Sequence, residues 1–540
     1  MGVSKLTKKI TILIGVSLSL FALLVTEFIL FLCLEIPIEK EIVYHKSDNT
    51  VLEQIIDSPV PKENTRAGIT TSFLNVDKSN IGDLSKYSKI EHLTINNVEE
   101  KEIQDIEGLQ VYSLSLKNVI DFDFSKLDTS RISSITLENS TVKDINDIKQ
   151  MTRLKSVDLN SLQIDDFDFL SDFDALWSLH ITNCKVNDFT AIGKIKRINN
   201  LSIRKCGLAN ASFLKDTNIE CLYINENRLT DISFIDKMTK LSSLDASRNL
   251  ITGNVILNDM PELKWVDLSF NEIDNIVCDV SSLYSLDLSY NSIDEISDEL
   301  LDKFEHITDK DAIITVNLFG NILDDCSNLN KFEFIKFIDE KEVSFSCKQY
   351  VDYTRTIKDI VEKYVDKDWS DIKKAVAIFD FISENTEYDR ELPDNDPFPY
   401  KHISHTEYGT LINKKAVCDG FAYAYRDILK YLGIESYIYH GDMISTTDNA
   451  AHAWNLVKID GLYYHCDLTA EISIAKYVDD IRNFGQSDGD VLEKSYFLLD
   501  KEAPKCDKNI NKDLVNEIVS ETRRYAGIEV DDNEEQGIVY

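Results

Sequence analysis

Apolar residues recur along the middle of the chain with a period that is too long for a single helix or strand. From about residue 67, the pattern L-x-x-L-x-L-x-x-N returns mostly every 21 or 22 residues. The copies begin at Ile90, Val111, Ile132, Leu154, Leu176, Ile198, Ile219, Leu241, Leu263, Leu283 and Ile313. This period predicts a solenoid in which each copy contributes one short parallel strand and a return segment.

The last position of the pattern is polar in an otherwise apolar series. This position holds Asn227, Asn249, Asn271, Asn291 and Asn321. An Asn side chain can both donate to and accept from backbone groups in the turn after each strand. Cys184 and Cys206 stand at the same position of two adjacent copies, so we expect both to be buried structural thiols rather than ligands.

Residues between the apolar strand positions of a solenoid face solvent on its concave side. Here they include aromatic side chains beside a ladder of acids, a combination that suits a protein or glycan ligand because aromatic anchors dominate interface energetics. The predicted binding residues are Trp177, Tyr223, Asp245, Trp265, Asp267, Phe270, Tyr284, Asp287 and Tyr290. The acids favour a basic partner. Alternatively, the aromatic residues only stabilise the arc through contacts between strands.

These copies resemble the leucine-rich repeat family, in particular the 22-residue bacterial kind of internalin-like surface proteins, over roughly residues 90–325. The resemblance implies parallel strands on the concave side and short helical segments on the convex side. It also implies that the concave side is the docking surface.

Helical spacing replaces the repeat pattern beyond residue 323. Ile357, Ile360 and Tyr364 have amphipathic spacing, and a second amphipathic segment runs over residues 372–382. We therefore expect a new domain to begin near residue 340.

A cysteine precedes the next amphipathic segment. Cys418 lies just before a helical pattern with Phe421, Tyr425 and Ile428 on one face. The partial positive charge at a helix N-terminus favours the thiolate over the thiol. Because the thiolate is the reactive form, Cys418 is a candidate nucleophile that needs a partner to carry protons.

Residues 452–468 predict a β-hairpin with a two-residue turn at Asp460 and Gly461. If Ile459 pairs with Leu462, residue 454 faces Asp467 across the ladder. The residue two positions before 454 then projects from the same face, as a diagonal neighbour of Asp467.

That diagonal neighbour is His452. The register therefore predicts that Asp467 orients the imidazole of His452, which would serve as the proton carrier for Cys418. His465 is a second candidate base on the same face, but it should pair with Leu456, further from Asp467.

Three motifs in this order resemble the transglutaminase-like superfamily of papain-like folds: V-C-x-G-x-A-x-A at 417–424, H-A-W-N at 452–455, and the Asp467 and Thr469 of the last segment. The resemblance covers about residues 350–500. It implies an α+β domain in which Cys418 attacks a carboxamide, His452 transfers the proton and Asp467 orients the ring. An amine or water would then resolve the thioester, giving cross-linking or hydrolysis.

The N-terminus contains an apolar run over residues 10–34, broken only by Glu27 and preceded by Lys5, Lys8 and Lys9. Its length predicts one transmembrane helix, and the lysines predict a cytoplasmic N-terminus. We therefore expect a single-pass cell-membrane protein with the bulk of the chain extracellular. A cleaved signal peptide is the alternative.

Charge and cysteine spacing exclude several classes of partner. The formal net charge of −36 and the lack of a basic cluster beyond the N-terminus argue against nucleic acid. No metal-like spacing and no nucleotide loop is present, so we expect neither a metal nor another cofactor. Cys326 and Cys347 could form a disulfide in an oxidising compartment.

The predicted organisation is a multi-domain chain. It comprises a cytoplasmic stub and anchor (1–35), a linker (36–66), leucine-rich repeats (67–330), a transglutaminase-like domain (340–500), and a helix with an acidic tail (501–540). The predicted function is that of a membrane-anchored extracellular thiol acyltransferase or amide hydrolase that acts on a protein, peptide or cell-wall substrate. The alternative is a surface adhesin whose transglutaminase-like domain is catalytically silent.

Overall fold

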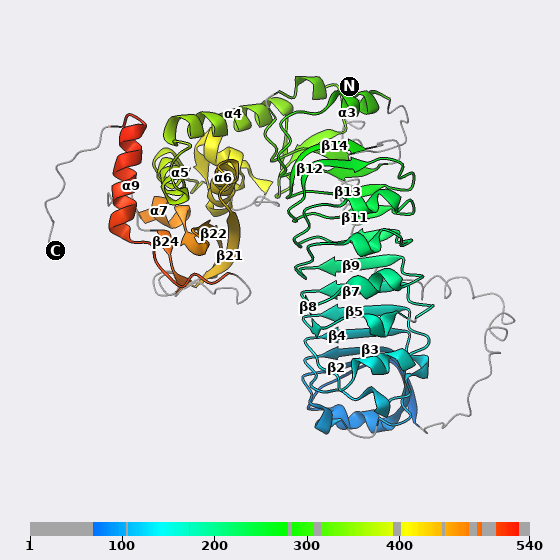
Figure 1. The fold of residues 1–540 in the computed structure, drawn as a ribbon. Helices are drawn as coiled ribbons and strands as arrows, with labels where there is room; N and C mark the ends of the chain where they lie inside the picture. The colour runs from blue at the N-terminus through cyan, green and yellow to red at the C-terminus, as the bar shows by residue number, and fades with distance from the viewer. Residues whose placement is uncertain are drawn as a thin grey trace, which may run out of the picture. The chain divides into compact units, whose positions relative to one another are not determined.

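The chain folds into two compact units. The repeat unit comprises Met1–Leu286 with Asp298–Ala312, and the C-terminal unit comprises Asp287–Ser297 with Ile313–Tyr540. The computed structural model describes residues 68–103, 106–171, 173–278, 283–306, 315–323, 325–391, 401–444, 449–474, 483–488 and 504–528 (Figure 1). The last repeats thus belong with the C-terminal unit, and the predicted domain limits at 330 and 340 stay a prediction.

No helix in the ranges given above is long and apolar enough to cross a bilayer. The predicted fold class with a transmembrane helix, the cell-membrane location and the membrane as a partner are corrected accordingly. They were inferred from hydropathy and flanking charge alone, and the predicted span at 10–34 lies outside the described residues.

The repeat unit is a ladder of short parallel strands whose order in the sheet follows the chain (Figure 1). The strands are β1 (Ile69–Val76), β2 (Tyr87–Asn96), β3 (Gln110–Lys117), β4 (Ser134–Glu138), β5 (Ser156–Asn160), β7 (Ser178–Thr182), β9 (Asn200–Arg204), β10 (Cys221–Tyr223), β11 (Ser243–Asp245), β13 (Trp265–Asp267) and β15 (Ser285–Asp287). Equivalent repeat positions pair, as Leu222 does with Leu201 and Leu244. The predicted solenoid of leucine-rich repeats is confirmed.

Short helical segments and small sheets return the chain between strands. The 3-10 helices are η1 (Ile81–Lys86), η2 (Glu100–Glu102), η3 (Phe124–Lys126), η4 (Thr129–Arg131), η5 (Ile145–Gln150), η6 (Asp168–Leu170), η7 (Thr190–Lys194), η8 (Ser212–Leu214) and η9 (Ser233–Lys237). Parallel pairs form between β6 (Gln163–Ile164) and β8 (Lys185–Val186), and between β12 (Thr252–Leu257) and β14 (Glu272–Cys278). The α-helix α3 (Asp298–Glu305) lies within the longest step of the repeat.

The Asn position of the repeats makes the predicted backbone hydrogen bonds. Asn249 Oδ1 accepts from the amide of Leu229 at 3.0 Å. Its Nδ2 donates to the carbonyl oxygens of Ile224 and Ala246, each at 3.0 Å. Cys184 replaces Asn in an earlier repeat and is a buried thiol, as expected, whereas Cys206 at the same position of the next repeat is only half-buried.

A residue with positive φ directly precedes this position and turns the chain out of the strand. Phe270 and Tyr290 both occupy such turns, each with φ of 55°. The Arg248 guanidinium lies 3.9 Å from the centroid of the half-buried Phe270 ring. Tyr290 is only 2% exposed, so the prediction that it lies on an exposed face is wrong, because it sits in the turn rather than on the strand.

The C-terminal unit begins with the end of the repeat pattern. Strand β16 (Thr315–Asn317) pairs in parallel with β17 (Ile335–Ile338), with η11 (Ser327–Leu329) between them. Strand β17 then pairs in antiparallel fashion with β18 (Ser344–Phe345). These two strands form a short hairpin immediately before helix α4 (Cys347–Tyr364).

An α/β arrangement follows. Antiparallel strands occur in the order β21 (Ser436–Ile444), β22 (Asn449–Ile459), β23 (Leu462–Cys466) and β24 (Phe484–Gln486), and α6 (Cys418–Tyr431) packs on β21 and β22. The other elements are α5 (Asp371–Asn385), β19 (Glu387–Tyr388), η13 (Ile403–His405), the π-helical turn η14 (Gly409–Asn413), β20 (Lys415–Ala416), α7 (Leu468–Ile474) and α9 (Lys512–Tyr525). The helices predicted before and after Cys418 are confirmed.

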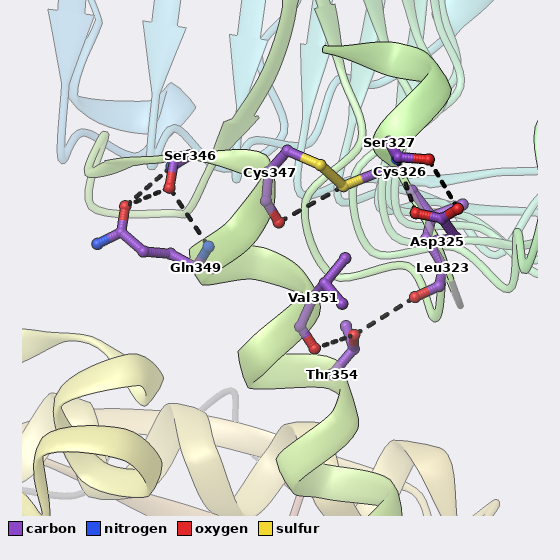
Figure 2. The surroundings of a disulfide bond; sticks show 9 residues. All are labelled: Leu323, Asp325, Cys326, Ser327, Ser346, Cys347, Gln349, Val351 and Thr354. Atoms are coloured by element: carbon purple, nitrogen blue, oxygen red, sulfur yellow. Dashed lines mark hydrogen bonds between the residues drawn. A yellow bond between two sulfur atoms is a disulfide. The ribbon is translucent and has the colours of Figure 1, made fainter.

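A disulfide joins Cys326 to Cys347, the first residue of α4 (Figure 2). A capping box begins this helix, since the amide of Gln349 donates to Ser346 Oγ and the Gln349 side chain accepts from the Ser346 amide. One turn further on, Thr354 Oγ1 donates to the carbonyl oxygen of Leu323. Covalent and polar contacts therefore hold α4 to the last repeat, and the sequence-based pairing is confirmed.

Candidate active site

The sulfur of Cys418 is positioned by a close backbone approach at the start of α6. Cys418 is the first residue of this helix, and the amide of Val417 donates to the carbonyl oxygen of Ser404 at 2.9 Å. A Cβ atom on Gly420 would lie 2.6 Å from that oxygen and 2.9 Å from the carbonyl oxygen of Thr406. Only glycine fits there, which explains the glycine of the V-C-x-G motif.

The predicted hairpin register is present in the structure. Ile459 pairs with Leu462. Asp460 and Gly461 have φ of 50° and 80°, the two positive values that a type I′ turn requires. The turn therefore sets which face of β22 carries residue 452.

The structure brings His452 and Asp467 together. His452 Nε2 lies 2.9 Å from Asp467 Oδ2, and both side chains are buried. Asp467 Oδ1 accepts from the amide of Ala470 at 2.9 Å, and the His452 ring stacks on Trp454. Backbone, carboxylate and indole together fix the plane of the imidazole.

His452 also interacts with Cys418. Burial by itself would lower the pKa of His452, but the hydrogen bonds to Asp467 and Cys418 and the charges of both groups raise it to about 10. The imidazole is therefore protonated at neutral pH. Cys418 is half-buried.

Sequence reasoning missed a group of charges beside the sulfur. Cys418 Sγ lies 3.2 Å from Asp419 Oδ1, and Lys341 Nζ lies 2.7 Å from Asp419 Oδ2. His405 Nδ1 is 3.2 Å from Asp419 Oδ1 but is not aligned for a hydrogen bond. Burial favours the neutral acid, yet Lys341 and His405 hold the pKa of Asp419 well below its usual range. Asp419 adjoins Cys418 in sequence and could have been noticed, whereas no sequence signal connects Lys341 to it.

The Asn of H-A-W-N ties the two halves of the site together. Asn455 Nδ2 donates to the carbonyl oxygen of Ala422 in α6 at 2.9 Å, and Asn455 is buried. The strand that carries His452 and the helix that carries Cys418 are thereby joined by a side chain from within the motif.

The second candidate base, His465, lies in a different network. Trp454 Nε1 donates to His465 Nδ1 at 2.8 Å, and His465 Nε2 lies 3.0 Å from Asp488 Oδ1. An indole N–H can only donate, so Nδ1 of the neutral ring is the acceptor and Nε2 carries the proton. These contacts place both ring nitrogens of His465 away from the role predicted for a base at Cys418.

His465, Asp488 and Cys506 also form a compact group, because one potential ligand atom from each lies within 4.8 Å of the others. A neutral histidine coordinates a metal through a nitrogen lone pair. The Trp454 hydrogen bond leaves Nε2 of His465 protonated instead, so the geometry favours a hydrogen-bonded network over a metal centre.

Apart from Phe270, the predicted binding residues of the repeat unit lie on its strands or, for Trp177 and Tyr284, directly before them. Trp177 and Tyr284 are exposed, whereas Tyr223 and Trp265 are half-buried. Asp245 pairs with Tyr223 on one side and with Asp267 on the other. Each acid accepts a hydrogen bond from the serine two residues later, and the same holds for Asp287 in the C-terminal unit. Burial and the charge of Asp267 raise the pKa of Asp245 to about 6.

Comparison with known proteins supports this description. Residues 358–468 match the model of the family described as "Transglutaminase-like superfamily", a range that contains Cys418, His452 and Asp467. Among curated proteins, none matches the sequence.

Solved structures with similar folds fall into two groups. An internalin from Listeria monocytogenes is 20% identical, with 48% of this chain and 89% of that chain covered and a TM-score of 0.32. The functional domain of InlJ from the same organism is 15% identical, with coverage of 47% and 54% and a TM-score of 0.34. A candidate cysteine protease from Cytophaga hutchinsonii is 19% identical, with coverage of 22% and 39% and a TM-score of 0.18.

Fold and site thus define a modular repeat protein that carries a cysteine-containing α/β domain. More specifically, the chain joins a solenoid of leucine-rich repeats with parallel strands to a region, residues 358–468, that matches the transglutaminase-like superfamily.

Proposed function

We propose that this protein is a thiol acyltransferase or amide hydrolase that acts on carboxamides of proteins or peptides. In this proposal Cys418 is the nucleophile, His452 carries the proton and Asp467 orients the imidazole. The main support is the buried hydrogen bond between His452 Nε2 and Asp467 Oδ2, at 2.9 Å, on an imidazole that also interacts with the thiol at the start of α6.

The first half of the reaction forms a thioester. The Cys418 thiolate attacks the carbonyl carbon of the amide, and the developing oxyanion accepts from amides at the start of α6, which have no partner within the helix. His452, protonated at neutral pH because its pKa is raised to about 10, donates its proton to the amide nitrogen. The C–N bond then breaks and ammonia leaves.

The second half releases the acyl group. A primary amine or water gives a proton to His452 and attacks the thioester carbon, and the C–S bond breaks to regenerate the thiolate. An amine yields a new amide, and water yields a carboxylic acid. Asp467 remains ionised throughout, because its role is to hold the imidazolium in place.

The repeat face would hold the protein partner. The exposed rings of Trp177 and Tyr284 and the in-register acids Asp245 and Asp267 support a protein or peptide with basic residues. Binding and chemistry would then be divided between the repeats and the transglutaminase-like domain.

One observation favours the second candidate function, an adhesin with a silent domain. The Asp419 carboxylate lies 3.2 Å from the Cys418 sulfur, and a nearby negative charge opposes formation of the thiolate. Under this alternative, the repeats carry the whole function.

Alkylation separates the two candidates. The protein is treated with iodoacetamide at pH 7, and labelled cysteines are mapped by mass spectrometry. A working nucleophile predicts that Cys418 reacts faster than glutathione, whereas Cys221→Ala, a change at another half-buried thiol, leaves that rate unaltered. A Cys418 rate no higher than that of glutathione would support the adhesin.

Turnover tests the chemistry directly. The protein is incubated with a glutamine-containing substrate and a fluorescent amine while released ammonia is measured. We expect Cys418→Ala to lower ammonia release by at least about a thousandfold, and Asp467→Asn to lower it by roughly 10²–10⁴-fold. Amine incorporation distinguishes transfer from hydrolysis.

A further inference from the structure

The hairpin that ends the repeats has a tightly ordered tip. Strands β17 and β18 pair Ile338 with Ser344, and residues 339–343 connect them. Asp339 Oδ1 accepts from the amides of Lys341 at 3.0 Å and Val343 at 2.7 Å. These bonds fix the direction in which residues 340 and 341 project.

Two side chains of this tip contact the helix that begins with Cys418. Lys341 Nζ lies 2.7 Å from Asp419 Oδ2, and Glu340 forms an ion pair with Arg426. Residues 419 and 426 are two helical turns apart and so share one face of α6. Tyr423 lies between them, and the centroid of its ring is 5.6 Å from Lys341 Nζ and 4.9 Å from Arg426 Cζ. The hairpin therefore follows the α6 face that starts beside the sulfur.

The charges at this contact oppose each other in their effect on Cys418. Asp419 Oδ1 is 3.2 Å from Cys418 Sγ, and a carboxylate at that distance repels the negative charge of a thiolate. Lys341 and Asp419 side chains are only 20% and 14% exposed, so solvent screens their charges weakly. The Lys341 ammonium group lies 2.7 Å from the other oxygen of the same carboxylate, and its positive charge opposes the field of Asp419 at the sulfur.

We propose that Lys341 is a positioning residue of the active site: from the hairpin of the last repeat, it pairs with Asp419 and thereby offsets the negative charge of that carboxylate beside the Cys418 nucleophile. This inference rests on the proposed function of Cys418. It means that the end of the repeats completes the electrostatic environment of the nucleophile.

Several other titratable groups surround the sulfur, and their charges also contribute to the electrostatic environment of Cys418. His452 approaches it from β22 and Tyr388 from β19, since the charge of Cys418 contributes to the raised pKa of both. His405 Nδ1 lies 3.2 Å from Asp419 Oδ1, the oxygen that also faces the sulfur. The charges of Lys341 and Asp419 also influence His440 on β21. The test therefore varies the Lys341–Asp419 pair and leaves these groups intact.

The experiment is the pH dependence of Cys418 alkylation in the full chain, with the label quantified at that residue. Four proteins are compared: wild type, Lys341→Met, Asp419→Asn and the double variant. We expect Lys341→Met to raise the midpoint of the curve of alkylation rate against pH by about one pH unit. The alkylation rate of Cys418 at neutral pH is then about tenfold lower. Asp419→Asn should leave the midpoint at or below that of wild type, and the double variant should return within about twofold of the wild-type rate.

Control variants separate charge from folding. Lys348→Met removes an exposed lysine of α4 and should not move the midpoint, while Lys341→Arg keeps the charge and should stay close to wild type. An unchanged midpoint in Lys341→Met overturns the proposal. So does a double variant that remains as slow as Lys341→Met, since that pattern indicates a structural role for the side chain.

The outcome is independent of whether the enzyme turns over an amide. If no ammonia is released by wild type, the proposed function fails, but the shift between Lys341→Met and the double variant still measures the charge coupling. If ammonia is released and the midpoint does not shift, only the role of Lys341 is refuted.

Discussion

His452 differs from an ordinary surface histidine in its ionisation state. Its pKa rises from 6.5 to about 10 although burial opposes the charge, because Asp467 and Cys418 stabilise the imidazolium. A charged imidazole beside a thiol is the state expected of a thiolate–imidazolium pair rather than of a neutral base. In the proposed reaction, the proton for the leaving amine is then in place before substrate binds.

This state makes the stability of the fold depend on pH. A pKa that is higher in the folded than in the unfolded protein adds stability that is complete below about pH 6.5 and is lost as the pH rises towards 10. We therefore expect the free energy of unfolding of wild type to decrease over that range more than that of His452→Gln. Urea denaturation at pH 6, 8 and 10 measures the difference, and parallel curves for the two proteins would contradict the assigned ionisation state.

Residues that are close in sequence could be assigned from sequence, and residues that are distant could not. The spacing of His452, Asp460, Gly461 and Asp467 sets a register, so the contact between histidine and acid follows from turn chemistry. Lys341 reaches Asp419 through the packing of a hairpin on a helix, and neither segment carries a signal of that contact.

At the scale of elements, the turn after each strand of the solenoid has two requirements. One residue adopts positive φ, as Arg248 does with φ of 53°, and the next supplies a buried side chain that bonds the backbone, as Asn249 does. The repeat period and the Asn position were evident from sequence. The positive φ was not, because bulky residues such as Phe270 and Tyr290 adopt it here and they rarely do so elsewhere.

Removal of one such side chain should weaken the solenoid. Asn249→Ala leaves the buried amide of Leu229 without its acceptor, which costs about 1–3 kcal/mol of unfolding free energy. The matched control is Asn330→Ala, where the side chain is exposed and the change should stay within about 0.5 kcal/mol. Chemical denaturation followed by circular dichroism gives both values. Equal losses in the two variants would show that the hydrogen bond from the Leu229 amide to Asn249 does not contribute to the free energy of unfolding.

The molecule as a whole is strongly acidic, with a formal net charge of −36. Asp245 and Asp267 are adjacent on neighbouring strands and half-buried, and burial raises the pKa of both. A basic ligand would relieve the repulsion between these two acids. The pair would therefore attract such a ligand more strongly than an isolated acid on the surface would.

Polylysine binding provides the test for this face. Asp245→Asn with Asp267→Asn should weaken binding about tenfold at low salt, whereas Asp274→Asn with Glu262→Gln, two exposed acids of the same unit, should have a small effect. Because the pKa of Asp245 is about 6, wild-type binding should also weaken between pH 7 and pH 5. Equal effects of the two double variants would refute a specific basic-partner site there.

The bond between Cys326 and Cys347 closes a loop that contains the whole β17–β18 hairpin. A protease that cuts once within residues 327–346 would produce two polypeptides that migrate together on a non-reducing gel and separate only after a thiol reductant is added. Nicking of this junction therefore cannot release the segment that contains Cys418 from the repeats unless reduction follows.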